Sequence, residues 1–196
     1  MRNASDPPGT LSPLKQALLA IEELQTRLRA SEQKEREPVA IIGLACRFPG
    51  GADNPAAFWR LLADGVDAVT EVPASRWNVD DFYDAGAPRP GKTCARHGGF
   101  LRDVEHFDPA SFGISPREAA SMDPQHRVLL EVARDALAAS GQLRDRLSGS
   151  PTGVFIGITT VEHGERQLGA EGLAALDAYH VTGNALNAAA GRLAYV

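Results

Sequence analysis

The sequence is poor in cysteine, in long apolar runs and in excess basic charge, and each shortage excludes a class of protein. Its two cysteines, Cys46 and Cys94, form no CxxC or Cys/His pattern, so neither a disulfide framework nor a zinc site is expected. The N-terminal residues lack an apolar stretch after basic residues, and no segment approaches the roughly 20 apolar residues of a membrane span. Because 20 basic and 25 acidic side chains leave a net charge of −5, nothing favours a nucleic-acid or membrane partner. We therefore expect a cytoplasmic protein with free thiols.

Several short motifs that carry chemistry are also missing. The chain has no GxGxxG, GxxxxGK[ST] or GxSxG string, so nucleotide-binding and serine-hydrolase functions have no support. Its five histidines show no metal-ligand spacing, and VEHGER around His163 differs from the HExxH of zinc enzymes. No metal site is predicted.

The first 36 residues divide into a polar leader and an amphipathic helix. Residues 1–11 contain too little apolar surface to offset the entropy of ordering, so we predict a disordered leader. Ser12 offers an N-cap hydroxyl, and Pro13 suits the first helical position. Over residues 12–36 the apolar side chains form one stripe at spacings of three and four, composed of Leu14, Ala17, Leu18, Ile21, Leu24 and Leu28.

This apolar stripe has two interpretations. It covers only about two heptads, fewer than the three or four that make a coiled coil secure, so the helix could pack on its own globular domain. The polar run from Ser31 to Glu37, followed by Pro38, instead indicates a helix held apart by a linker. We favour an intermolecular coiled-coil or docking partner for this face.

Residues 37–196 are predicted to form a globular α/β domain. VAIIG, at residues 39–43, and TGVFIGI, at residues 152–158, are apolar runs typical of buried parallel strands. Between them, helix-start signals occur at Asn54-Pro55, at the capping box Ser115-Pro116-Arg117-Glu118 and at Asp123-Pro124. This alternation of strands and helices predicts a parallel sheet covered by helices.

Residues 66–114 lack sustained periodicity and contain prolines and a glycine pair, so irregular structure is expected there. Their aromatic residues are unevenly spaced: Trp77, Phe82, Tyr83, Phe100, Phe107 and Phe112. We predict that these rings pin loops to the core and do not form a ligand site.

The C-terminal segment predicts a helix without an end. Asn184 can cap the helix ALNAAAGRLAYV, but no glycine or polar turn closes it. Because apolar side chains continue to Val196, we expect the natural domain to continue beyond this residue.

Several long strings of residues 37–196 resemble a known family. They are EPVAIIGLACRFPGG, NPAAFWRLLADGVDAVTEVPASRW, GGFLRDVEHFDPASFGISPREAASMDPQHRVLLEVARDALAASG, TGVFIGI and TGNALNAAAGRLAYV. In this order they resemble the opening of the β-ketoacyl synthase (ketosynthase) domain of modular type I polyketide synthases. Residues 12–36, beginning SPLKQALLAIEELQTRL, are similar to the docking segments that precede such ketosynthases.

The resemblance implies the first half of a thiolase-like, layered α-β-α-β-α fold, preceded by a docking helix. It implies transfer of an acyl chain from the phosphopantetheine thioester of an acyl carrier protein to a cysteine, and then decarboxylative condensation with a malonyl-type extender. The implied partners are a second copy in a homodimer, the acyl carrier protein and the C-terminal docking tail of an upstream subunit. No cofactor is expected to bind directly.

The resemblance assigns no catalytic residue within this chain. The family's cysteine lies in a DTACSSS-like string after an AGRxSY segment, and its two histidines lie further along; none of these strings occurs here. Cys46 and Cys94 are therefore expected to be structural, and the chain alone to be inactive. Where the family usually has DPQQR this chain has His126, and where it has serine before Tyr195 this chain has Ala194.

By resemblance, Thr182, Gly183 and Asn184 lie near the subunit interface and the acyl pocket, with simple helix capping as the alternative. Two other functions remain open for the whole chain. It could be a non-catalytic docking module acting through residues 12–36, or a small thiol enzyme with Cys46 as nucleophile.

Overall fold

The computed structural model describes residues 12–35, 38–86, 89–142 and 144–195, which divide into two units at residues 41 and 42. The predicted leader, residues 1–11, lies outside the described residues. Within those residues, no helix combines the length and the apolar character that a bilayer crossing requires.

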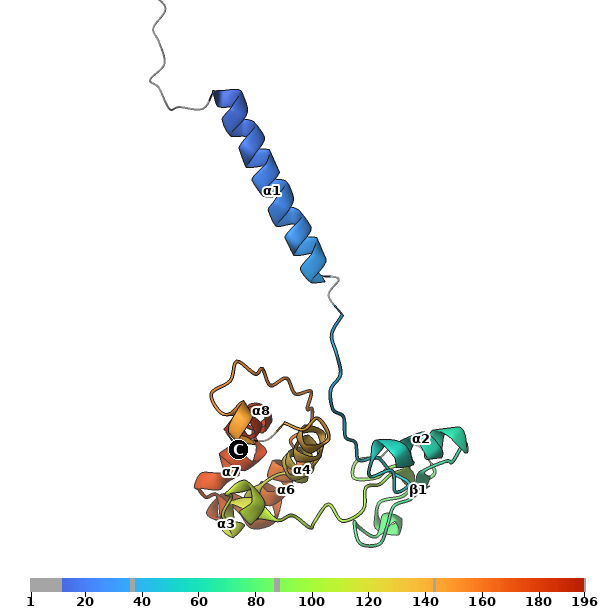
Figure 1. Ribbon diagram of the computed structural model, residues 1–196. Coiled ribbons are helices and arrows are strands. Elements are labelled where there is room, and N and C mark those ends of the chain that lie inside the picture. The colour runs from blue at the N-terminus through green and yellow to red at the C-terminus, as the bar shows by residue number, and fades with distance from the viewer. Residues whose placement is uncertain (1–11, 36–37, 87–88, 143, 196) are drawn as a thin grey trace, which may run out of the picture. The chain divides into compact units, whose positions relative to one another are not determined.

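The first unit consists of one long helix, α1 (Pro13–Glu35), followed by an extended segment (Figure 1). The helix begins where the sequence predicts, because the Ser12 carbonyl accepts from the Gln16 amide at 3.0 Å and the Ser12 hydroxyl accepts from the Lys15 amide at 3.4 Å. Arg27 and Glu23 form an ion pair with N···O 2.6 Å, one turn apart.

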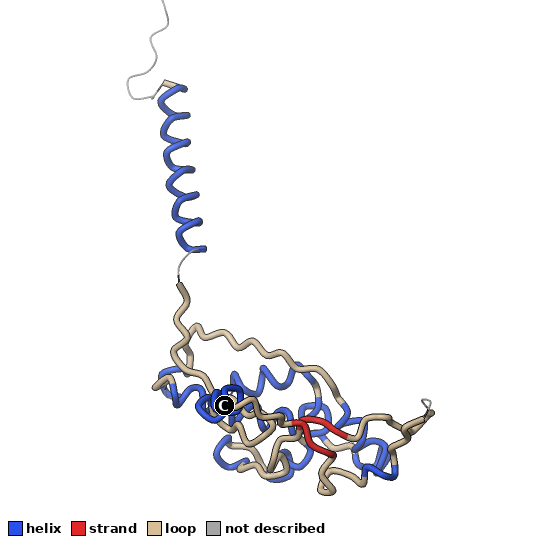
Figure 2. Tube along the Cα trace, turned by 90° about the vertical axis from the view of Figure 1, so that its right-hand side faces the viewer, coloured by secondary structure: helices blue, strands red, loops and turns tan. Residues whose placement is uncertain are grey.

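The second unit is mainly helices and loops (Figures 1 and 2). Its α-helices are α2 (Pro55–Ala63), α3 (Pro116–Ser121), α4 (Pro124–Ala139), α5 (Arg144–Leu147), α6 (Glu162–Glu171), α7 (Ala178–Asn184) and α8 (Leu186–Tyr195). Short 3-10 helices are η1 (Val79–Asp81), η2 (Pro109–Phe112) and η3 (Gly172–Ala175). The strands are β1 (Val69–Glu71) and β2 (His97–Gly99).

The helix starts predicted in this unit are confirmed by side-chain caps. The Asn54 side chain accepts from the Ala57 amide at 2.9 Å, and the Asp123 carboxylate accepts from the Gln125 amide at 2.8 Å. The Ser115 hydroxyl accepts from the Glu118 amide at 3.1 Å, but the Glu118 carboxylate pairs with Arg192 of α8. The predicted capping box is therefore half formed, because its acidic residue ties α3 to α8.

The prediction that residues 39–43 and 152–158 form parallel strands is wrong for the described structure. The only sheet of the described residues is the antiparallel pair β1–β2, in which Val69 faces Gly99 (Figure 2). Residues 39–43 and 152–158 are unpaired loops; Val39 and Phe155 are each 93% exposed, whereas Val154, Ile156 and Ile158 are half-buried. A parallel strand is stable only when neighbouring strands pair with its edges, and the described residues supply no such strand to these runs.

The core lies at the start of α4. Its buried residues are Phe112, Ile114, Ala119, Met122 and Leu130, with Phe107 and Leu193 packed against them. Phe107 stacks on Phe112 with ring centroids 5.3 Å apart, which confirms the anchoring role predicted for these two aromatic residues. This core fixes α3, α4 and α8 relative to one another and thereby positions the polar residues of α7.

Candidate functional site

The segment Thr182–Asn184 forms the last turn of α7 and packs against the junction between α3 and α4. The Asp123 amide donates to the Gly183 carbonyl at 2.9 Å. A Cβ atom on Gly183 would lie 2.6 Å from the Ser121 carbonyl oxygen, so only glycine permits this approach. The structure thus shows Gly183 in close backbone packing, while its predicted place near the subunit interface and the acyl pocket stays a prediction.

The Asn184 side chain joins three segments. Its Nδ2 atom donates to the Ser121 carbonyl at 3.0 Å, to the His180 carbonyl at 2.8 Å and to Gln167 Oε1 at 3.2 Å. Its Oδ1 atom is buried and has no partner among the described residues. The expectation that Asn184 caps the last helix is wrong, because a cap requires Oδ1 to accept an amide of α8 and this side chain instead turns toward α3.

Two histidines with no role predicted from the sequence, His126 and His163, lie near Asp123. His126, in the first turn of α4, is 1% exposed, and neither ring nitrogen has a partner among the described residues. His163 Nε2 lies 3.1 Å from the side-chain amide of Gln167. Burial lowers the pKa of both imidazoles, although the carboxylate of Asp123 partly opposes this change. Both rings are therefore neutral near pH 7.

Neither cysteine is hydrogen-bonded to a base within the described residues. Cys46 is half-buried, Cys94 is exposed, and neither is hydrogen-bonded to a histidine or a carboxylate in the described part of the chain. Across the same residues, no three side chains of histidine, cysteine, aspartate or glutamate are grouped for a metal ion. The geometry around Asn184 thus builds a scaffold and carries no catalytic group.

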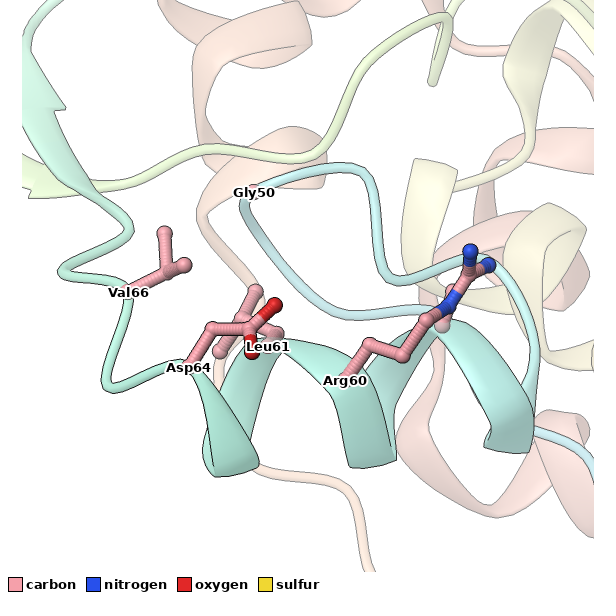
Figure 3. A pocket seen from close by; sticks show the side chains of 6 residues that line it. Gly50, Arg60, Leu61, Asp64 and Val66 are labelled. Carbon is pink, nitrogen blue, oxygen red and sulfur yellow. The ribbon is translucent and has the colours of Figure 1, made fainter.

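The described residues of the second unit form at least two surface cavities. The smaller, about 240 Å³, lies beside α2, where the side chains of Arg60, Leu61 and Asp64 line it below the loop at Gly50 (Figure 3). The larger, about 500 Å³, combines basic and aromatic side chains, namely Arg76, Trp77, Phe82, Lys92 and Arg166. Trp77 and Phe82 are 44% and 47% exposed, so part of each ring remains open to solvent.

The predicted docking residues lie on α1, and all six are exposed: Leu14, Ala17, Leu18, Ile21, Leu24 and Leu28. Leu19 is also exposed but lies outside the stripe with its spacing of three and four. The first unit therefore presents an apolar face of α1 that is exposed to solvent.

Comparison with known proteins identifies relatives over nearly the whole chain. The family model for the β-ketoacyl synthase N-terminal domain matches residues 36–196. A phenolphthiocerol/phthiocerol polyketide synthase of Mycobacterium tuberculosis is 44% identical over 191 residues, which cover 96% of this chain. Polyketide synthase GfsB of Streptomyces halstedii is 48% identical over 160 residues, or 81% of this chain. The chain spans only 9% and 3% of these two relatives.

Two solved structures share the fold of this chain. The oxazolomycin ketosynthase domain OzmH KS7 of Streptomyces albus JA3453 is 39% identical with a TM-score of 0.70, over 79% of this chain and 26% of that one. The ketosynthase from module 6 of the bacillaene synthase of Bacillus subtilis 168 is 35% identical with a TM-score of 0.62, over 80% and 24%. These likenesses confirm the predicted fold class.

Proposed function

Because this chain belongs to the β-ketoacyl synthase family as the leading part of a modular polyketide synthase ketosynthase, we propose that it contributes the frame, and not the reacting groups, of an acyl-condensing enzyme. The observation that carries the proposal is the match of residues 36–196 to the family's N-terminal domain. The parent enzyme accepts an acyl chain from the phosphopantetheine thioester of an acyl carrier protein and condenses it with a malonyl-type extender in the cytoplasm. No cofactor binds the chain directly.

The chemistry of the described residues supports a structural role for this chain. Acyl transfer through a covalent intermediate requires an activated nucleophile, and neither Cys46 nor Cys94 contacts a base in the described residues. Thr182, Gly183 and Asn184 instead fix α7 against α3 and α4, and we assign them to the support of the acyl pocket or of the subunit interface.

Acylation by a small thioester tests the enzymatic proposal. The chain and a longer protein that spans the full length of the matched ketosynthases are each incubated with an acyl N-acetylcysteamine thioester, and the mass of each is measured. We expect one acyl group on the longer protein, on a cysteine beyond residue 196, and none on the chain itself. Acylation of Cys46 in the chain would favour the alternative of an independent thiol enzyme and contradict our proposal.

The second part of the proposal concerns α1. We assign its apolar stripe to a homodimeric docking helix that also receives the C-terminal tail of an upstream subunit. Two observations support it: the six stripe residues are exposed, and the mycobacterial match covers 96% of this chain, so it includes most of the 23 residues of α1. A stripe of this kind gains stability only by covering its apolar face with another helix.

Charge placement within the stripe tests the docking proposal. Ile21→Asp puts a carboxylate on the apolar face, whereas the control Thr26→Asp adds the same charge on the polar face, 140° away at about 100° per residue. We expect sedimentation to show that Ile21→Asp abolishes the dimer and that Thr26→Asp retains it, because an unpaired charge is not tolerated in an apolar interface. A chain that is monomeric before any substitution would refute pairing through α1.

A further inference from the structure

The larger cavity concentrates positive charge on a chain whose net charge is −5. Three basic side chains, Arg76, Lys92 and Arg166, line it, and no carboxylate belongs to its described lining. Like charges gathered around one hollow repel each other, so an anion placed between them is attracted by all three.

Each of these basic side chains keeps donors for a ligand. An Nη atom of Arg76 donates to the Leu101 carbonyl at 2.8 Å, and the Lys92 ammonium donates to the Asp81 carbonyl at 2.8 Å. These single bonds orient the two groups and, within the described residues, leave most of their five and three donor hydrogens without a partner. Arg166 is exposed on α6, and its guanidinium forms no ion pair or hydrogen bond within the described residues.

The same cavity displays two flat apolar surfaces. Trp77 and Phe82 line it and remain about half exposed, whereas large aromatic rings usually gain stability from full burial. Trp77 is held by edge-on contact with Phe100, at a centroid separation of 6.5 Å. The partly exposed Trp77 ring therefore offers a surface for stacking against a planar group.

We propose that this cavity binds a small phosphate ester that also carries a planar ring. A phosphate dianion matches the three cations and the bidentate donors of arginine, and the ring would stack on Trp77 or Phe82. A cavity of about 500 Å³ lies within the range of small-molecule sites, whereas a peptide would need a longer groove. This inference goes beyond the proposed function and does not depend on it.

Phenyl phosphate is the minimal probe, and tryptophan fluorescence is the readout. The chain contains two tryptophans, so the full chain carrying Trp59→Phe reports on Trp77 alone. We expect saturable quenching by phenyl phosphate that weakens with added salt, and binding of inorganic phosphate or phenol at least about tenfold weaker, because each offers half of the recognised chemistry.

Charge reversal within the cavity provides the matched comparison. Arg166→Glu should weaken phenyl phosphate at least about tenfold, while Arg146→Glu, which changes the same charge on α5 outside the cavity, should not alter it. Circular dichroism checks that both variants keep their helices. The affinities of adenosine monophosphate and 4′-phosphopantetheine are then compared, because the first carries a planar ring and the second is the flexible arm of a carrier protein. Tighter binding of adenosine monophosphate supports the proposal.

Four results would overturn the proposal. They are the absence of saturable quenching up to about 10 mM phenyl phosphate, equal binding of inorganic phosphate, tighter binding of 4′-phosphopantetheine, and an Arg166→Glu variant that binds like the parent. Tighter binding of a short acidic peptide than of phenyl phosphate would likewise reassign the cavity to a protein partner.

Discussion

His126 makes the stability of the second unit depend on pH. The ring is 1% exposed and both nitrogens lack partners among the described residues, so the folded state disfavours its protonation. Burial is the main cause of its lowered pKa; Asp123 opposes the shift and Arg192 adds to it. A histidine whose folded pKa is lowered contributes its full stability above the unfolded value of about 6.5, and that stability falls as the pH drops below it.

The size of the effect follows from one proton. If the folded ring stays neutral, lowering the pH from 8 to 5.5 costs about 1.4 kcal/mol, because the unfolded chain alone binds the proton. His126→Leu removes this pH-dependent cost. It also removes the penalty of roughly 1–3 kcal/mol for a buried polar group without a partner. Imperfect packing of the leucine offsets up to about 1.5 kcal/mol of this gain. We therefore expect the variant to be within about 0.5 kcal/mol of the parent or more stable at pH 8, and to gain up to about 1.4 kcal/mol relative to the parent at pH 5.5.

Urea denaturation at several pH values measures this difference. His163 also has a lowered pKa, but it is present in both proteins, so its contribution cancels when the parent is subtracted from the variant. His106→Leu is the control for removing an imidazole, because this side chain is 80% exposed and its loss empties no buried site. A difference between His126→Leu and the parent that stays constant from pH 8 to 5.5 would refute the reasoning.

Two further predictions concern contacts of the second unit. Gly183→Ala should lower the free energy of unfolding by about 1–3 kcal/mol, because the added Cβ would lie 2.6 Å from the Ser121 carbonyl oxygen. Gly191→Ala is the control: this position in α8 has open space around it, so the substitution should be neutral or stabilising. Thermal denaturation measures both effects. Glu131→Gln should cost about 1 kcal/mol by removing the charge from a partly buried 2.6 Å pair with Arg47, and a double-mutant cycle with Arg47→Met that shows no coupling would contradict this.

Local signals in the sequence predicted helix starts well. Each cap at Ser12, Asn54, Ser115 and Asp123 involves a side chain and an amide no more than three residues away, so the necessary information is contained in adjacent residues. The long stripe of α1 was equally accessible, because a helix satisfies its own backbone and its face follows from residue spacing alone.

Contacts between distant segments were not accessible in this way. The Asn184 side-chain amide donates to the Ser121 carbonyl, 63 residues earlier, and no periodicity in either segment predicts that hydrogen bond. The larger cavity joins Trp77 and Lys92 to Arg166, so its charge and its aromatic surface become visible only after folding. The one available signal was composition, because the interval from 76 to 92 contains both aromatic and basic residues.

The stripe of α1 and the predicted strands 39–43 and 152–158 all carry exposed apolar side chains, yet they differ physically. Every interior amide of α1 is bonded within the helix, so the stripe requires only side-chain contacts from a partner. The strand segments also leave their backbone donors and acceptors without protein partners, which makes burial of their apolar side chains costly until a neighbouring strand pairs with them. A partner of α1 can therefore dock as a preformed helix, whereas the strand segments must gain hydrogen bonds and apolar cover in the same step.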